Sequence, residues 1–114
     1  KFLMDTGGNE ITLMSEVQSE DVVIIPAFGT TLETEALLKE IGVDIKKYDT
    51  TCPFVERVWK RSSKLGGDDF TVVIHGKPTH EETRATFSHA SNAGPALIVS
   101  DREEAVILAE IIKG

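Results

Sequence analysis

Cys52 is the only cysteine in the 114-residue chain, and its position suggests a chemical role. It is followed by Pro53 and then by a helical pattern from Phe54 to Leu65. Proline is tolerated in the first turn of a helix, where its missing N–H removes no hydrogen bond. The thiol is therefore expected at a helix N-terminus, where free N–H groups favour the thiolate that binds metals or attacks electrophiles. A small buried apolar side chain is the alternative interpretation.

A second group of reactive side chains lies in the segment His75–Thr83, which follows an apolar strand pattern. The segment holds two histidines, one lysine and two acids where a helix is expected to begin. A histidine beside a helix N-terminus suits a phosphate group, and a glutamate near a bound anion can hold and deliver a proton. A capped helix with solvated acids in its first turn is the alternative interpretation.

Short apolar runs alternate with helical patterns along the chain, and these elements must position both groups. Strands are expected at 22–25, 43–48, 70–74 and 96–99. Helices are expected at 31–41, 54–65 and 80–89, and a last one after Ser100 or Asp101. This alternation predicts an α/β fold, a mostly parallel sheet flanked by helices. Ligands of such sheets bind beyond the carboxyl ends of the strands, so the Phe28–Gly29 turn, Cys52 and His75–Glu82 are expected to cluster there.

The other prominent side chains are expected to have structural roles. Trp59 is expected in the core or at a domain interface, and His89 at a helix end on the surface. The last helix has residues that can form an apolar face: Ala105, Val106, Leu108, Ala109 and Ile112.

Composition and charge narrow the classes of function. A net charge of −7 argues against nonspecific binding to nucleic acid or to an anionic membrane. A single cysteine cannot form an internal disulfide, which favours a reducing compartment. No apolar run approaches the roughly 20 residues of a membrane span. The strand-like opening at Lys1–Met4 suggests the middle of a longer protein or a processed terminus.

Three segments occur in an order that resembles one enzyme family: Val23–Gly29, Asp49–Trp59 and Ile74–Thr86. The second resembles the central cysteine motif of the 4-hydroxy-3-methylbut-2-enyl diphosphate reductases, and the third resembles their substrate-binding loop. These are the iron–sulfur enzymes that end the non-mevalonate isoprenoid pathway. The resemblance runs over nearly the whole chain. Phe28 stands where many bacterial members carry histidine, whereas plant and cyanobacterial-type members have phenylalanine.

The resemblance implies a role for each residue that matches a family motif. Cys52 would be the second of three cysteines that ligate a [4Fe–4S] cluster. His80 would bind the substrate diphosphate, and Glu82 would supply protons to the leaving hydroxyl. Residues with a supporting role in the substrate loop would be His75, Lys77 and Thr83. Electrons would come singly from a ferredoxin or a flavodoxin.

The resemblance also implies an organisation. The parent protein would convert hydroxymethylbutenyl diphosphate to isopentenyl and dimethylallyl diphosphate by reductive dehydroxylation, in the cytoplasm or in a plant's plastid stroma. Residues 1–52 would end the first of three α/β lobes, and residues 53–114 would form most of the second. Because the family needs three cysteine ligands and this chain has one, the segment alone is expected to lack the cluster and to be inactive.

Two other functions stay open on the residues alone. One is a separate α/β module that holds a small phosphorylated ligand at the His75–Glu82 loop without a cluster. The other is a cysteine-nucleophile enzyme that uses Cys52 and a histidine. Flanking cysteines in the full reading frame would favour the reductase, whereas a true gene product of 114 residues would favour the binding module.

Overall fold

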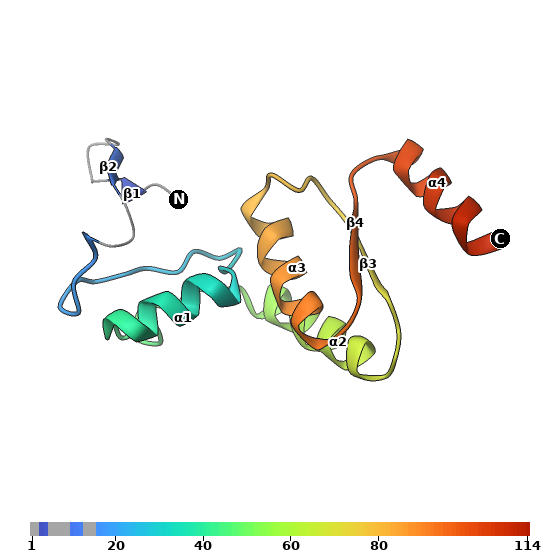
Figure 1. The fold of residues 1–114 in the computed structure, drawn as a ribbon. Coiled ribbons are helices and arrows are strands. Elements are labelled where there is room, and N and C mark those ends of the chain that lie inside the picture. The colour runs from blue at the N-terminus through green and yellow to red at the C-terminus, as the bar shows by residue number, and fades with distance from the viewer. Residues whose placement is uncertain (1–2, 5–9, 13–15) are drawn as a thin grey trace.

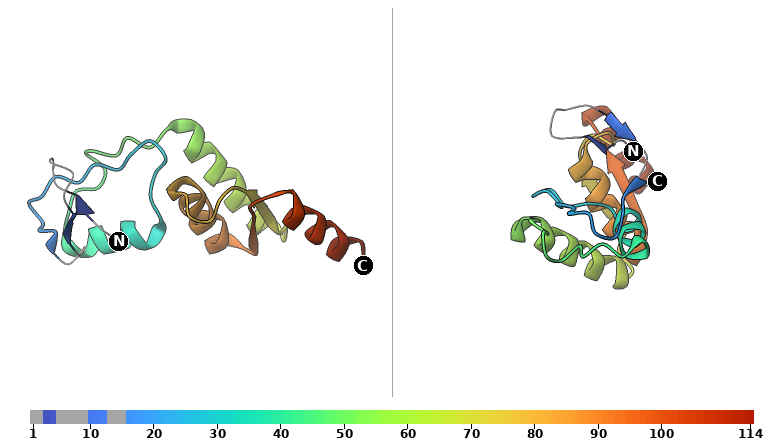
Figure 2. Two further views of the ribbon diagram at one scale, coloured as in Figure 1. Left: turned by 90° about the horizontal axis from the view of Figure 1, so that it is seen from above. Right: turned by 90° about the vertical axis from the view of Figure 1, so that its left-hand side faces the viewer.

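The computed structural model describes residues 3–4, 10–12 and 16–114 of the chain. Near the N-terminus, β1 (Leu3–Met4) pairs antiparallel with β2 (Glu10–Thr12). The elements that follow are α1 (Leu32–Ile41), α2 (Pro53–Gly67), β3 (Val72–His75), α3 (Glu81–Ala93), β4 (Ala96–Val99) and α4 (Arg102–Lys113). α1 lies toward one end of an elongated molecule and α4 at the other (Figures 1 and 2).

β3 and β4 form a parallel pair, in which Val72 is opposite Ala96 and His75 is opposite Val99. α3 connects the two strands and packs against both of them, while α2 also contacts β3 and α4 contacts β4. A helical crossover between parallel strands is the usual βαβ arrangement. The predicted α/β class is therefore confirmed, with a small parallel sheet flanked by helices.

The sheet is smaller than predicted, because the expected strand at 22–25 is not a regular strand. Ile25 instead forms an isolated parallel bridge with Asp49. The main-chain N–H of Thr50 donates to the Ile25 carbonyl oxygen at 3.0 Å, as in a parallel ladder. One further bond follows the same pattern, from the Cys52 N–H to the Ala27 carbonyl oxygen at 2.8 Å, but no regular strand forms in this segment.

The expected strand at 43–48 is also wrong, since this segment forms turns. The Asp44 carboxylate accepts hydrogen bonds from the main-chain N–H groups of Lys46 and Lys47, at 3.2 and 3.3 Å. Aspartate commonly turns a chain in this way, by offering the backbone a local side-chain acceptor. The local turn replaces the pairing that the apolar pattern predicted.

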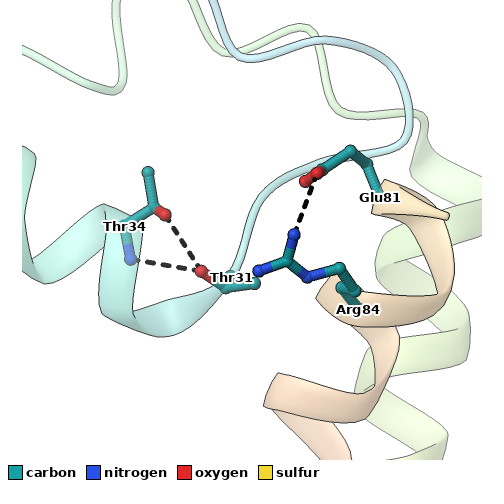
Figure 3. Close-up of polar contacts among 4 residues, drawn as sticks. All are labelled: Thr31, Thr34, Glu81 and Arg84. Atoms are coloured by element: carbon teal, nitrogen blue, oxygen red, sulfur yellow. Dashed lines mark hydrogen bonds and ion pairs between the residues drawn. The ribbon is translucent and has the colours of Figure 1, made fainter. Parts of the chain in front are cut away.

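The helix predicted at 31–41 is confirmed as α1, and both of its ends follow local signals. The Thr31 side chain accepts a hydrogen bond from the Thr34 N–H at 3.2 Å, which satisfies a free donor of the first turn (Figure 3). Gly42 ends the helix with φ of 96°, a left-handed conformation that glycine adopts without a steric penalty.

α4 begins at the predicted cap but leaves much apolar surface exposed. The Asp101 side chain accepts from the Glu104 N–H, and the Glu104 carboxylate accepts from the Ser100 N–H, a reciprocal pair like a capping box but shifted by one residue. The helix extends beyond the sheet, and Val106 and Ile112 are 52% and 74% exposed. None of the helices in the described residues is long and apolar enough to cross a membrane.

α2 and α3 pack side by side and run in the same direction (Figure 1). The Trp59 Nε1–H donates to Thr86 Oγ1 at 3.3 Å, across 27 positions of sequence. One turn farther along both helices, the Ser63 hydroxyl donates to the His89 carbonyl oxygen at 3.5 Å, across 26 positions. Because the offset hardly changes along the pair, the N-termini of the two helices lie at the same end.

Trp59 is buried as predicted, whereas the expectation of a surface His89 is wrong. His89 is half-buried, and its ring stacks on the Trp59 indole with centroids 3.8 Å apart and planes at 9°. His89 shares a face of α3 with Thr86, three residues earlier, and that face packs against α2. The helix–helix contact therefore draws the histidine inward.

The C-terminal ends of α2 and α3 approach closely where both carry glycine. A Cβ on Gly94 would lie 2.6 Å from the Gly66 carbonyl oxygen and 2.8 Å from its Cα. Both contacts are with main-chain atoms, so no side chain can rotate away to make room.

Gly94→Ala should therefore destabilise the chain by about 1–3 kcal/mol, the usual cost of overpacking a tight contact. The measurement is urea unfolding followed by circular dichroism. Gly67→Ala is the matched control, because a Cβ there meets nothing within 4 Å. Because Gly67 is the last residue of α2, this change should alter stability by less than about 0.5 kcal/mol. Equal effects of the two substitutions would contradict the close approach.

Candidate functional site

Cys52 is the N-cap residue of α2, with extended backbone angles, and Pro53 follows in the first turn. Its thiol is free and half-buried, and it makes no capping hydrogen bond. The Cys52 main-chain N–H donates to the Ala27 carbonyl oxygen at 2.8 Å, so the residue is fixed to the segment before the Phe28–Gly29 turn. The predicted place of the thiol at a helix N-terminus is confirmed.

His80 and Glu82 begin α3 in the same way. His80 is the N-cap residue, and its side chain is exposed and makes no capping hydrogen bond. Its main-chain N–H donates to the Lys77 carbonyl oxygen at 3.0 Å, which closes the loop. Glu82, in the first turn, is also exposed. The neighbouring Glu81 instead forms a partly exposed ion pair with Arg84 at 3.3 Å, on the side of α3 that faces the start of α1 (Figure 3).

A small pocket joins the first turns of the two helices. It has a volume of about 150 Å³ and is lined by Phe54, Val55, Val58, Glu82 and Thr86. The α2 side chains in it are apolar, so the exposed Glu82 side chain shares this pocket with a hydrocarbon wall. Sequence reasoning missed this wall, although its members follow Cys52 at helical spacing.

The Phe28–Gly29 turn belongs to the same end of the molecule. Gly29 has φ of 75°, and a Cβ there would overlap two atoms of the Trp59 ring and lie 3.4 Å from Thr51 Cγ2. The turn therefore packs on the first half of α2. The turn and Cys52 thus lie together at the start of α2, and the pocket that Glu82 lines joins this end of α2 to α3.

Thr83 and Lys77 support the loop between β3 and α3 in different ways. Thr83 is buried, and a Cβ on Gly76 would lie 2.5 Å from its hydroxyl oxygen, so the side chain holds the loop close to the helix. Lys77 is exposed and contributes its carbonyl oxygen to the turn at His80.

His75 does not join the cluster, since its side chain faces the other side of the sheet. It lines a pocket of about 460 Å³ with Val73, Val99 and residues of α4. On the opposite face, Ile98 lines a different pocket with Phe87 of α3. Because side chains alternate along a strand, the last residue of β3 points away from α3.

Sequence reasoning also missed Ser88, which joins α1 to α3. Its Oγ accepts from the Leu32 N–H at 2.9 Å, and its hydroxyl donates to the Glu33 carboxylate at 2.9 Å. A side chain from one helix thus satisfies the first turn of another. No local pattern signals such a contact, because 56 positions separate the partners.

In the part of the chain that the structure describes, no three side chains of His, Cys, Asp or Glu gather closely enough to hold a metal ion. Cys52 therefore offers a single thiol, at the end of α2 whose first turn shares a pocket with Glu82. The chemistry that this arrangement supports is binding of an anion at the α3 N-terminus and proton transfer from Glu82.

The sequence of this chain is similar to those of several cyanobacterial reductases. It is 49% identical over 113 residues to the 4-hydroxy-3-methylbut-2-enyl diphosphate reductase of Synechococcus sp. (strain CC9311), covering 99% of this chain and 27% of that protein. The reductase of Synechococcus sp. (strain WH7803) is 51% identical over 100 residues, which are 88% of this chain and 24% of that protein. The chain thus spans about a quarter of the length of these relatives.

Solved structures agree with the fold. The structure of (E)-4-hydroxy-3-methyl-but-2-enyl diphosphate reductase, the terminal enzyme of the non-mevalonate pathway, matches with a TM-score of 0.74 and 27% identity. The match covers 90% of this chain and 35% of that one. The corresponding reductase from Plasmodium falciparum matches with a TM-score of 0.72 over 82% of this chain and 28% of that one. At 19% identity, this second likeness supports the fold alone.

A protein-family model described as "LytB protein" matches residues 4–113. The match covers nearly the whole chain and includes both the cysteine turn and the loop that begins α3. The chain therefore belongs to the LytB protein family.

Proposed function

We propose that this chain is part of a 4-hydroxy-3-methylbut-2-enyl diphosphate reductase. The observation that carries the proposal is the common end of α2 and α3, where Cys52, His80 and Glu82 begin the two helices. The relatives that bear this activity are about four times as long, so the segment supplies part of an active site. It contributes one metal-binding thiolate and the groups that hold and protonate the substrate.

The start of α3 is suited to the diphosphate. Its first N–H groups and the helix dipole attract an anion. The His80 side chain makes no capping hydrogen bond, so it is free to donate one to the anion. Lys77, on the exposed loop, adds positive charge nearby. Thr83 holds the loop against the helix. The His75 side chain lies on the far face of the sheet, so this residue would act only through the course of its main chain into the loop.

Glu82 is placed to deliver a proton to the leaving hydroxyl, which then departs as water. Glu82 lines the small pocket together with Val55 and Phe54, whose hydrocarbon surface would lie beside the substrate. Glu81 cannot share this role readily, because its carboxylate is turned toward Arg84.

Cys52 fits one ligand of a [4Fe–4S] cluster, since its thiol is free and stands at a helix N-terminus. When bound, the cluster supplies the electrons of the reduction, which a ferredoxin or flavodoxin provides in turn. A single thiolate cannot hold a cluster with roughly four ligand positions. The remaining cysteine ligands would therefore come from beyond these 114 residues.

The lobe boundary at residue 52 and the cytoplasmic location are further parts of the proposal. The boundary has support from the pairing of Ile25 with Asp49 on one side and of β3 with β4 on the other. The two parts would meet where Ser88 of α3 caps α1 and where Trp59 packs on Gly29.

A chimera tests the metal role directly. Residues 4–113 replace the matching segment of the Synechococcus sp. (strain CC9311) reductase, and the protein is purified without oxygen. Iron and sulfide content should equal that of the parent enzyme, because the segment brings its own Cys52 thiolate. Cys52→Ser should lose most of the iron and all activity. A Cys52→Ser chimera with full iron content would remove Cys52 from the ligand set.

Glu82 and His80 should differ in their kinetic effects in the same chimera. Glu82→Gln keeps the shape but removes the transferable proton, so kcat should fall about 10²–10⁴-fold with little change in KM. His80→Ala should mainly raise KM, because it removes a hydrogen bond to the charged diphosphate.

Glu81→Gln is the matched control for Glu82→Gln, since it makes the same chemical change at the adjacent residue. It breaks only an exposed ion pair and should leave turnover near normal. Equal losses of kcat for the two glutamine variants, at unchanged iron content, would argue against Glu82 as the proton donor.

A further inference from the structure

Trp59 of α2 contacts two other segments at the candidate site, α3 and the Phe28–Gly29 turn. The indole is 8% exposed, and its Nε1–H donates to the buried hydroxyl of Thr86. One face of its ring stacks on His89, and the ring edge fills the space that a side chain at Gly29 would occupy. One side chain thus ties α2 to α3 and to the Phe28–Gly29 turn.

The contact between Trp59 and Thr86 lies one helical turn from the proposed chemistry. Trp59 follows Val55 by four residues, and Thr86 follows Glu82 by four residues. Positions four apart stack on one face of a helix. Val55, Glu82 and Thr86 line the same small pocket, which agrees with this stacking.

The hydrogen bond between Trp59 and Thr86 can fix the relative orientation of α2 and α3 as well as pack them together. An apolar side chain would fill the space, but it would not fix how far each helix turns about its own axis. The indole N–H donates in one direction only, and a buried threonine hydroxyl is costly to leave without a partner. The hydrogen bond therefore constrains rotation, and the stack with His89 constrains separation.

We propose that Trp59 is a positioning residue that sets the placement of Glu82 relative to Cys52. The inference rests on the proposed reductase function. Proton delivery demands close alignment, and a displacement of about 1 Å can lower a rate by about 10²-fold. Attraction of an anion to a helix N-terminus changes less steeply with a small displacement, because Coulomb energy varies only inversely with distance. Loss of the hydrogen bond between Trp59 and Thr86 should therefore reduce kcat while KM stays nearly unchanged.

The experiment uses the chimera described above, with its cluster loaded. Trp59→Phe keeps an aromatic ring for the stack but removes the N–H, and Thr86→Val removes the acceptor with little change of shape. Each should lower kcat by about 10- to 100-fold with KM nearly unchanged and iron content equal to the unsubstituted chimera. Because both changes break one hydrogen bond, the double variant should be no slower than the slower single variant.

Ser63→Ala is the matched control. It removes the next hydrogen bond between the same two helices, one turn farther from the site, and should leave kcat unchanged. An equal loss in Ser63→Ala would reduce Trp59 to general packing and overturn the proposal. A loss of iron in proportion to the loss of kcat in both Trp59→Phe and Thr86→Val would overturn it too.

Failure of this inference is distinct from failure of the proposed function. If the chimera is active and Glu82→Gln is slow, normal kcat in both Trp59→Phe and Thr86→Val overturns the positioning role alone. If the unsubstituted chimera binds no iron and is inactive, the proposed function fails and the positioning role fails with it. Should Trp59→Phe not fold, Thr86→Val tests the same hydrogen bond by itself.

Discussion

The parallel packing of α2 against α3 is the constraint on which the rest of the structure depends. Helices that run in the same direction bring their positive ends together, which is electrostatically unfavourable unless an anion or thiolate is bound there. Side-chain contacts must therefore hold the pair, through Trp59 in the middle and the Gly66–Gly94 approach at the far end. The same arrangement makes the N-terminal end receptive to negative charge.

Local signals predicted the helices well, because each helix end is determined by residues beside it. Thr31 and Gly42 cap α1 at the predicted position, and α4 starts after Asp101, one of its two predicted starting points. β4 also lies at its predicted position. The strand expected at 43–48 failed because the Asp44 carboxylate offers nearby N–H groups a closer partner than another strand does.

The candidate site was predictable only in part, since its geometry depends on contacts between distant residues. The helix starts at Cys52 and His80 followed from proline and turn patterns, but their common end followed from Trp59 and Thr86. His75 was grouped with Glu82 because both lie in one loop, although alternation along β3 turns its side chain to the other face. The inward position of His89 had no local signal.

The exposed edges and face of the β3–β4 pair affect the solubility of this segment. Among the described residues, neither β3 nor β4 pairs with a further strand. On one face of the pair, Val73 is 48% exposed and Leu97 is 44% exposed. Parallel strands are normally covered on both faces, and an open strand edge is a template for pairing with another chain. Left uncovered, this segment would self-associate at high concentration, so the surface that completes the sheet also protects the protein from aggregation.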